Sequence, residues 1–209
     1  SLVWREKLLE HWISQDLLHL KSFDASDTYV DIAAASSPWA KIQREIHGLN
    51  AFANDLISVG EDYSHLDYYR VEDATASAFR DASVMGASLH CAFEMFSADD
   101  DIALMRELGR ILKPGGKAVI LPLYLHTHYC AYATPEYYAK GYSDPEAKEY
   151  IRLDCRGIPS SRKYSPEILG SRVLKTIEEA ALQYKLYVLR NKKDLGEGVY
   201  CHFILEIQK

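Results

Sequence analysis

The strongly apolar run at residues 117–125 constrains the fold more than any other segment of the chain. The run reads KAVILPLYL and follows directly on Pro114 and two glycines. A strand without a polar face is typical of a parallel sheet that helices cover on both sides. Before it, residues 101–112 bring apolar side chains onto one face at helical spacing, and Pro114 with the glycines ends that helix. The segment therefore predicts a helix that leads into a buried parallel strand.

Strand and helix patterns also alternate along the first half of the chain. Apolar residues at helical spacing predict one or two amphipathic helices within residues 2–20. Ser37 as N-cap and Pro38 at the first helical position predict another helix, which ends near Gly48. The strand candidates lie at residues 29–34, 50–56, 68–73 and 84–90. Such alternation predicts βαβ units and a parallel sheet.

The C-terminal part follows a different pattern. A helix at residues 166–181 is followed by two strand candidates at residues 182–191 and 198–207, which a short polar loop joins. Such a hairpin adds an antiparallel strand to the sheet. We therefore expect one α/β domain over residues 1–209, with N-terminal helices in residues 1–23 and an insertion at residues 126–165.

Charge and cysteine content narrow the possible partners. The 209 residues carry a net charge of −6 with no run of lysine or arginine, which argues against a nucleic-acid partner. No apolar run reaches the roughly 18 residues of a membrane span, and we expect no membrane partner. The chain begins at Ser1 without a signal-like segment, and its four cysteines are widely spaced. Reduced thiols in a cytoplasmic protein are the expected state.

Acidic and small residues follow the predicted strands. In an open α/β sheet, ligands bind beyond the carboxyl ends of the strands. Asp31 stands there with a turn of alanines and serines, and Asp55 follows the second strand. Asp73 and Ala74 follow the third strand. An acidic side chain at the end of the second strand is well placed to accept hydrogen bonds from ribose hydroxyls.

Taken in order, these segments resemble a class I S-adenosylmethionine-dependent methyltransferase. The resemblance rests on DIAAASS from Asp31, on Asp55, on VEDATA from Val71, on ASLHCAFEMF from Ala87 and on ELGRILKPGGKAVI from Glu107. It implies a Rossmann-like three-layer sandwich with a mostly parallel seven-stranded sheet and a C-terminal antiparallel hairpin. It also implies that Asp31 lies near the methionine end of the cofactor, Asp55 at the ribose and Asp73 with Ala74 at the adenine. Leu89 and His90 would close over the sulfonium side.

The first loop departs from the family pattern, because Ala33, Ala35 and Ser37 stand where the family has glycine. A non-glycine residue at positive φ costs roughly 1–2 kcal/mol, so we expect the turn to follow a path that alanine tolerates. The substitutions disfavour a dinucleotide, whose pyrophosphate must lie against the backbone. The carboxylate of S-adenosylmethionine can still meet amides or hydroxyls near Ser36 and Ser37. We therefore count Ala33, Ala35 and Ser37 among the cofactor-binding residues.

His90 and Glu94 are the candidate catalytic residues. A hydroxyl or protonated amine acceptor needs a base of near-neutral pKa, and His90 is the first candidate. A hydrogen-bonded histidine with a purely structural role is the alternative for the same residue.

The insertion at residues 126–165 is longer than an ordinary connection and rich in tyrosine. Its residues 145–153 resemble a helix that packs on the sheet edge. The tyrosines suit a sugar or aromatic acceptor, or a protein contact surface. His126, His128 and Cys130 would share one side of an extended strand and could hold zinc, but no fourth ligand is evident, and we predict no metal.

The predicted function is methyl transfer from S-adenosylmethionine to a small-molecule or sugar acceptor. One alternative is an inactive methyltransferase-like protein that binds a partner through the tyrosine-rich insertion. A less favoured alternative is an NAD(P)-dependent oxidoreductase. The sequence leaves the acceptor and the oligomeric state open.

Overall fold

A seven-stranded sheet forms the centre of the molecule. The computed structural model describes residues 3–56, 65–138, 144–158 and 160–209, so the first two residues of the predicted N-terminal helices lie outside the described part. The strand order is β3-β2-β1-β4-β5-β10-β9, with all neighbours parallel except β10, which is antiparallel to β5 and β9. The bounds are Thr28–Ile32 (β1), Asn50–Asp55 (β2), Tyr69–Val71 (β3), Val84–His90 (β4), Leu112–Leu123 (β5), Gln183–Val188 (β9) and Phe203–Gln208 (β10). This order confirms the predicted parallel sheet and its antiparallel C-terminal strands.

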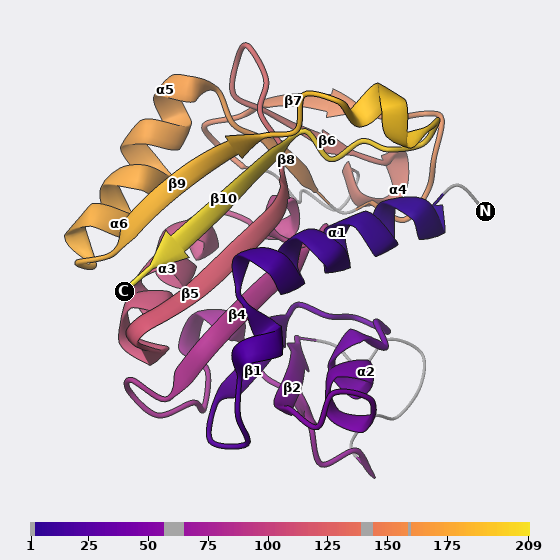
Figure 1. Cartoon of the computed structure of the whole chain (residues 1–209). Coiled ribbons are helices and arrows are strands. Elements are labelled where there is room, and N and C mark those ends of the chain that lie inside the picture. Colours follow the sequence, from indigo (N-terminus) through magenta and orange to yellow (C-terminus); the bar gives the residue numbers. More distant parts are fainter. Residues whose placement is uncertain (1–2, 57–64, 139–143, 159) are drawn as a thin grey trace.

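Helices cover both faces of the sheet, which gives three layers (Figure 1). The α-helical and π-helical elements are α1 (Val3–Leu17), α2 (Trp39–Glu45), α3 (Asp100–Ile111), α4 (Pro135–Tyr138), α5 (Pro166–Ile168), the π-helical η5 (Leu169–Leu174) and α6 (Lys175–Glu179). Short 3₁₀ turns are η1 (Leu20–Ser22), η3 (Ala74–Ala76), η4 (Phe93–Met95) and η6 (Lys192–Leu195). No helix in the described part of the chain is long and apolar enough to cross a membrane.

Two apolar clusters fill the spaces between the layers. Leu104 and Leu108 of α3 and Ile177 of α6 pack on one face of the sheet with Val30, Leu89 and Ile120. On the other face, Ile13 of α1 and Trp39 of α2 pack with Tyr29, Val119 and Leu121. The apolar side chains of β5 thus point into both clusters, as expected for a strand buried on both sides.

Several predicted boundaries and one predicted element are wrong. Helix α3 ends at Ile111, and β5 already begins at Leu112, so the Pro-Gly-Gly sequence lies within the strand. The pairing of β4 with β5 shifts register there, from Val84 opposite Leu112 to Gly86 opposite Lys117, and Gly115 takes φ of +82° in the resulting bulge. The two C-terminal strands are shorter than predicted.

Residues 145–153 contain a strand and no helix. Strand β7 (Lys148–Ile151) pairs with β6 (Cys130–Ala133), which also pairs with β8 (Ser161–Lys163), so that the insertion forms a small three-stranded sheet. This sheet follows β5 at its carboxyl end (Figure 1). Its chain returns to β5 through Tyr164, whose amide donates to the Tyr124 carbonyl at 3.0 Å.

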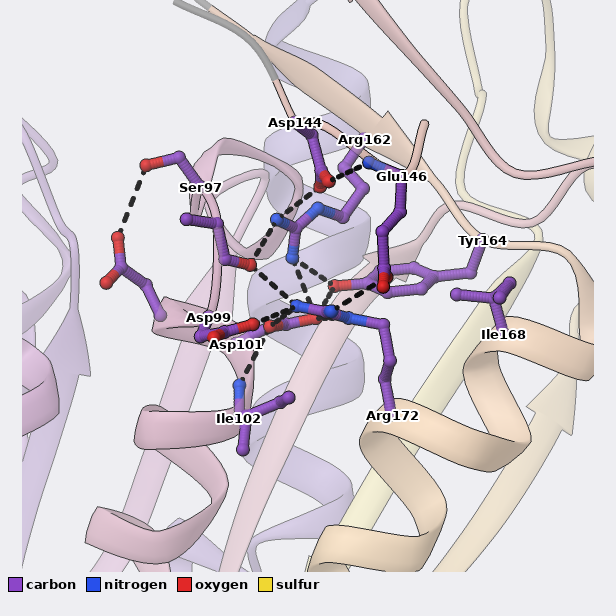
Figure 2. Close-up of polar contacts among 12 residues, drawn as sticks. Ser97, Asp99, Asp101, Ile102, Asp144, Glu146, Arg162, Tyr164, Ile168 and Arg172 are labelled. Atoms are coloured by element: carbon purple, nitrogen blue, oxygen red, sulfur yellow. Dashed lines mark hydrogen bonds and ion pairs between the residues drawn. The ribbon is translucent and has the colours of Figure 1, made fainter. Parts of the chain in front are cut away.

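A buried ion cluster fastens the insertion to the helical layer (Figure 2). We call Asp101, Asp144, Arg162, Tyr164 and Arg172 the arginine cluster. The Arg162 guanidinium lies 2.7 Å from Asp101 Oδ2 and 2.6 Å from Asp144 Oδ2, and Arg172 Nη2 lies 2.8 Å from Asp101 Oδ1. Burial alone would raise the pKa of Asp101, but the hydrogen bond from Arg172 and the charge of Arg162 lower it below the ordinary value. The cluster therefore holds α3, η5 and the insertion together.

Candidate functional site

Two cavities meet at the carboxyl ends of the parallel strands. The first, of about 300 Å³, lies among the loops that follow β1, β2, β3 and β4, and Asp55, Asp73, Ala74 and Phe96 line it. The second, of about 760 Å³, lies between the loop after β1 and helix α1. Ala33, Ala35 and Cys91 line both cavities. The loop after β1 is therefore the boundary between two spaces that can each hold part of a ligand.

The loop after β1 keeps the backbone path of a glycine loop although it contains alanine. Ala33 has φ of 52° and Ala35 has φ of 47°, so the expectation of a path that alanine tolerates is wrong at both positions. The neighbouring strands hold this path: Asn54 Oδ1 accepts from the Ala33 amide at 3.2 Å, and Asp55 Oδ2 accepts from the Ala35 amide at 2.9 Å. The Tyr69 hydroxyl donates to the Ala35 carbonyl at 2.7 Å. The strain is roughly 1–2 kcal/mol for each residue.

Ser37 and Ser36 line the second cavity where the loop enters α2. The Ser37 hydroxyl accepts from the Trp39 amide at 3.3 Å, as an N-cap does, although Pro38 itself occupies the cap position and α2 begins at Trp39. The predicted helix start is thus displaced by one residue. Ser37 is not among the positive-φ residues, so only two of the three replaced glycines carry strain.

Asp31 and His90 form a buried pair at the ends of β1 and β4. His90 Nδ1 lies 3.0 Å from Asp31 Oδ1, and His90 Nε2 lies 3.0 Å from the Ser14 hydroxyl of α1. Both side chains line the second cavity. Both ring nitrogens of His90 are engaged, which fixes the orientation of the ring. Asp31 Oδ2 is buried and has no hydrogen-bond partner among the described residues, so the site holds one carboxylate oxygen ready for a ligand.

The other predicted cofactor-binding residues differ in whether they line a cavity. Asp55 and Ala74 line the first cavity, and Asp55 also supports the loop after β1. Asp73 lines the same cavity but caps η3, because its Oδ1 accepts from the amide and the hydroxyl of Thr75. Leu89 is fully buried in the core and lines neither cavity, whereas Cys91 lines both.

Glu94 lies in η4 and is 8 % exposed. Burial raises the pKa of its carboxyl to about 7, and the nearby charge of Lys163 lowers it only in part. Glu94 Oε2 has no hydrogen-bond partner within the described residues. Burial also lowers the pKa of Lys163 to about 8, and its ammonium lies 3.2 Å from the centre of the Tyr124 ring. Glu94 lines neither of the two cavities, so the structure does not bring it together with His90 at a cavity wall.

Helix α1 supplies site residues that the sequence pattern did not indicate. Lys7 and His11 line the second cavity together with Trp4 and Leu8. The His11 ring stacks on Trp39 with centroids 4.2 Å apart, and burial and the neighbouring His90 lower the pKa of His11 to about 3. His11 is therefore neutral near pH 7. The available signal was the four-residue spacing of Lys7 and His11, which places both on one side of the helix.

Comparison with known proteins identifies the family and the fold. A family model described as a methyltransferase domain matches residues 14–120. No protein of curated function matches the chain. Among solved structures, the 1,6-didemethyltoxoflavin N1-methyltransferase of Burkholderia thailandensis is 12% identical, with a TM-score of 0.61 over 96% of this chain and 76% of that one.

Two further structures show the same fold. The geranyl diphosphate C-methyltransferase of Streptomyces coelicolor A3(2) has a TM-score of 0.58 at 14% identity, over 97% of this chain and 79% of that one. A putative methyltransferase from Haloferax volcanii, in complex with the activator Trm112, has a TM-score of 0.55 at 16% identity, over 98% and 93% of the two chains. At these identities the likeness concerns the fold.

Proposed function

This chain belongs to the methyltransferase domain family, and we propose that it transfers a methyl group from S-adenosylmethionine to a small molecule. The observation that carries the proposal is the pair of cavities that meet at a glycine-like loop beside the unpartnered oxygen of Asp31. Toxoflavin and geranyl diphosphate methyltransferases of similar fold are described by their small-molecule substrates, which favours an acceptor of that kind.

The residues present fit S-adenosylmethionine. Asp55, Asp73 and Ala74 of the first cavity would hold the ribose and adenine, and Asp31 would accept from the ammonium of the methionine part. The hydroxyls and amides of Ser36 and Ser37 would meet its carboxylate. When bound, this cofactor supplies a methyl group that its sulfonium activates for transfer to a nucleophile.

The second cavity suits an acceptor with an apolar body. Trp4, Leu8 and Ile42 form its walls, while Asp31 and His90 lie at the strand ends. An aromatic or aliphatic body would bury its surface against these walls, with the reacting oxygen, nitrogen or carbon towards the strand ends. The prominence of apolar side chains favours such a molecule over a sugar.

The protein's own contribution is chiefly alignment of acceptor and methyl group. Asp31 and Ser14 orient His90, whose ring forms part of the cavity wall. His90 is the candidate base for an acceptor that loses a proton, because it lies at the wall of the second cavity, whereas Glu94 lines neither cavity and does not reach that acceptor directly.

Calorimetric titration with S-adenosylhomocysteine and with NADH tests the proposal. We expect the first to bind and the second not to bind. Asp31→Asn should weaken S-adenosylhomocysteine binding by roughly 10- to 100-fold, because a charge-assisted hydrogen bond contributes about 1.5–3 kcal/mol. Asp194→Asn, at an exposed position in η6, is the matched control and should leave the affinity unchanged.

Folded protein that does not bind S-adenosylhomocysteine at millimolar concentration would contradict the proposal. That result would favour the inactive, partner-binding alternative. The Cβ atoms of Ala33 and Ala35 at the cavity walls, where the family has glycine, are consistent with this alternative. Binding of NADH in its place would favour the oxidoreductase.

A further inference from the structure

His126, His128 and Cys130 come together where the chain leaves β5 and enters β6. The chain bends at residues 127 and 128, so the three side chains are not arranged along one extended strand. One potential ligand atom from each residue lies within 4.8 Å of the other two, and no other such triple of histidine, cysteine or acidic residues occurs in the described ranges. The atoms need to approach by little more than 1 Å to meet the spacing that a tetrahedral metal centre requires, given bonds of about 2.0–2.3 Å.

We propose that these residues bind a borderline divalent cation of the zinc type, with water at the fourth position. Two imidazoles and a thiolate select such ions over magnesium or calcium, which prefer oxygen ligands. His126 is exposed and Cys130 is fully buried, so the ion would sit at the surface with its thiolate side inward. The sequence offers no fourth protein ligand, which is why no metal was expected from it, but an open position needs none.

Surrounding groups support the cluster in the way that outer ligands support known metal sites. His128 Nε2 lies 2.9 Å from the Tyr150 hydroxyl of β7, which leaves Nδ1 for the ion. The His126 and His128 rings meet edge to face with centroids 4.5 Å apart. The Thr127 hydroxyl lies 3.3 Å from His126 Nδ1 and 3.4 Å from His128 Nδ1, so both Nδ1 atoms lie near one point, and this hydroxyl would rotate away when an ion enters.

Two lysines lie beside Cys130 in the small sheet. The neighbours of Cys130 across β6 are Lys148 on β7 and Lys163 on β8. Their ammonium groups lie over aromatic rings, that of Lys148 over Tyr150 at 5.2 Å and that of Lys163 over Tyr124 at 3.2 Å. Both ammonium groups thus lie against aromatic rings, and neither lysine is an ion-pair partner of a ligand residue.

Cobalt titration of the metal-free, reduced protein tests the site. We expect one Co²⁺ per chain, a thiolate-to-cobalt charge-transfer band and visible bands of tetrahedral intensity, with Zn²⁺ displacing the cobalt. His126→Ala, at an exposed position, should weaken cobalt binding by more than about 100-fold, and Tyr150→Phe by about 10-fold. Cys130→Ser should lose the charge-transfer band.

Cys155→Ser and His47→Ala are matched controls, since they remove a half-buried thiol and an exposed imidazole elsewhere, and both should bind cobalt like the original chain. A second measurement, the rise in melting temperature with Zn²⁺, should be present in the controls and absent in His126→Ala. The proposal is overturned if the original protein gives no charge-transfer band, if the band survives Cys130→Ser, or if Cys155→Ser removes it. None of these outcomes depends on methyl transfer.

Discussion

Two groups of buried carboxyls in this molecule differ in whether the protein supplies hydrogen-bond partners for their oxygens. In the arginine cluster, Asp101 accepts from Tyr164 and both arginines, and Asp144 pairs with Arg162. Asp31 in β1, Glu94 in η4 and Glu149 in β7 each keep one buried oxygen without a hydrogen-bond partner in the described part of the chain. The carboxyls of the first group find their partners within the protein, whereas each carboxyl of the second group keeps an oxygen without one.

The difference separates a structural role from a chemical one. A buried charge that is fully paired holds its surroundings in one arrangement, and removing a partner is costly. A buried carboxyl with an open oxygen weakens the folded state, so its persistence needs another explanation, such as binding or proton transfer. Of the described carboxyls with an open oxygen, only Asp31 lines one of the two cavities, so its open oxygen supports the proposed site without use of the family match.

The largest expected effect concerns the arginine cluster. Arg162→Met leaves Asp101 and Asp144 without their shared cation, and we expect unfolding free energy to fall by about 3–5 kcal/mol. Urea denaturation at pH 7 measures it. Arg152→Met, which removes the exposed pair with Asp154, is the matched control and should cost less than about 1 kcal/mol. Equal losses of unfolding free energy in the two variants would mean that the buried cluster stabilises the fold no more than an exposed ion pair does.

Glu94 should have an effect of slightly smaller size and of opposite sign. Its pKa rises from 4.5 to about 7 on folding, so between these values the native state keeps a proton that the unfolded chain has lost. Stability from this group is present below pH 4.5 and is lost as the pH rises to 7. Glu94→Gln should therefore be more stable than the original chain above pH 7, by up to about 3 kcal/mol, and similar below pH 4.5.

Denaturation curves of both proteins between pH 4 and pH 8 measure this difference. Burial also raises the pKa of Glu6 to about 7, but Glu6 is present in both proteins and cancels from the comparison. A difference that does not vary with pH would mean that the pKa of Glu94 is the same in the folded and the unfolded chain.

The smallest expected effect concerns the loop between the two cavities. Ala33→Gly and Ala35→Gly should each stabilise the protein by about 1 kcal/mol, because glycine adopts positive φ without strain. Ala34 lies between them and does not have a positive φ. Ala34→Gly should therefore destabilise the protein by roughly 0.5–1 kcal/mol. Thermal unfolding compares the three variants. The same sign for all three would contradict the left-handed path of Ala33 and Ala35.

Local patterns predicted much of the fold. The apolar stretch 84–90 is the strand Val84–His90, and the helix expected at 101–112 is Asp100–Ile111. The pattern failed where distant partners decide the structure. Residues 145–153 have a helical composition, but backbone pairing with Cys130–Ala133 makes Lys148–Ile151 a strand.

The site was predictable only in part, for a similar reason. Asp31 and Asp55 stand out as acidic residues in or near the ends of predicted strands, whereas the contact between His90 and Ser14 joins residues 76 positions apart. Helix α1 buries Glu6, Glu10 and Ser14 and exposes Leu8 and Trp12. Apolar periodicity cannot indicate such a helix, because part of its buried side faces polar groups at the strand ends.

The π-helical turn η5 has a consequence for how this chain can change in evolution. Arg172 lies in that turn and reaches Asp99, Asp101 and Glu146 from it. Each residue of an α-helix advances the side-chain direction by about 100°, so deletion of one residue here would swing Arg172 away from its partners. Substitutions on the exposed side of the helix leave this geometry intact. The length of the segment is thus under tighter constraint than most of its composition, and variants of this chain should retain the number of residues between Ser165 and Arg172.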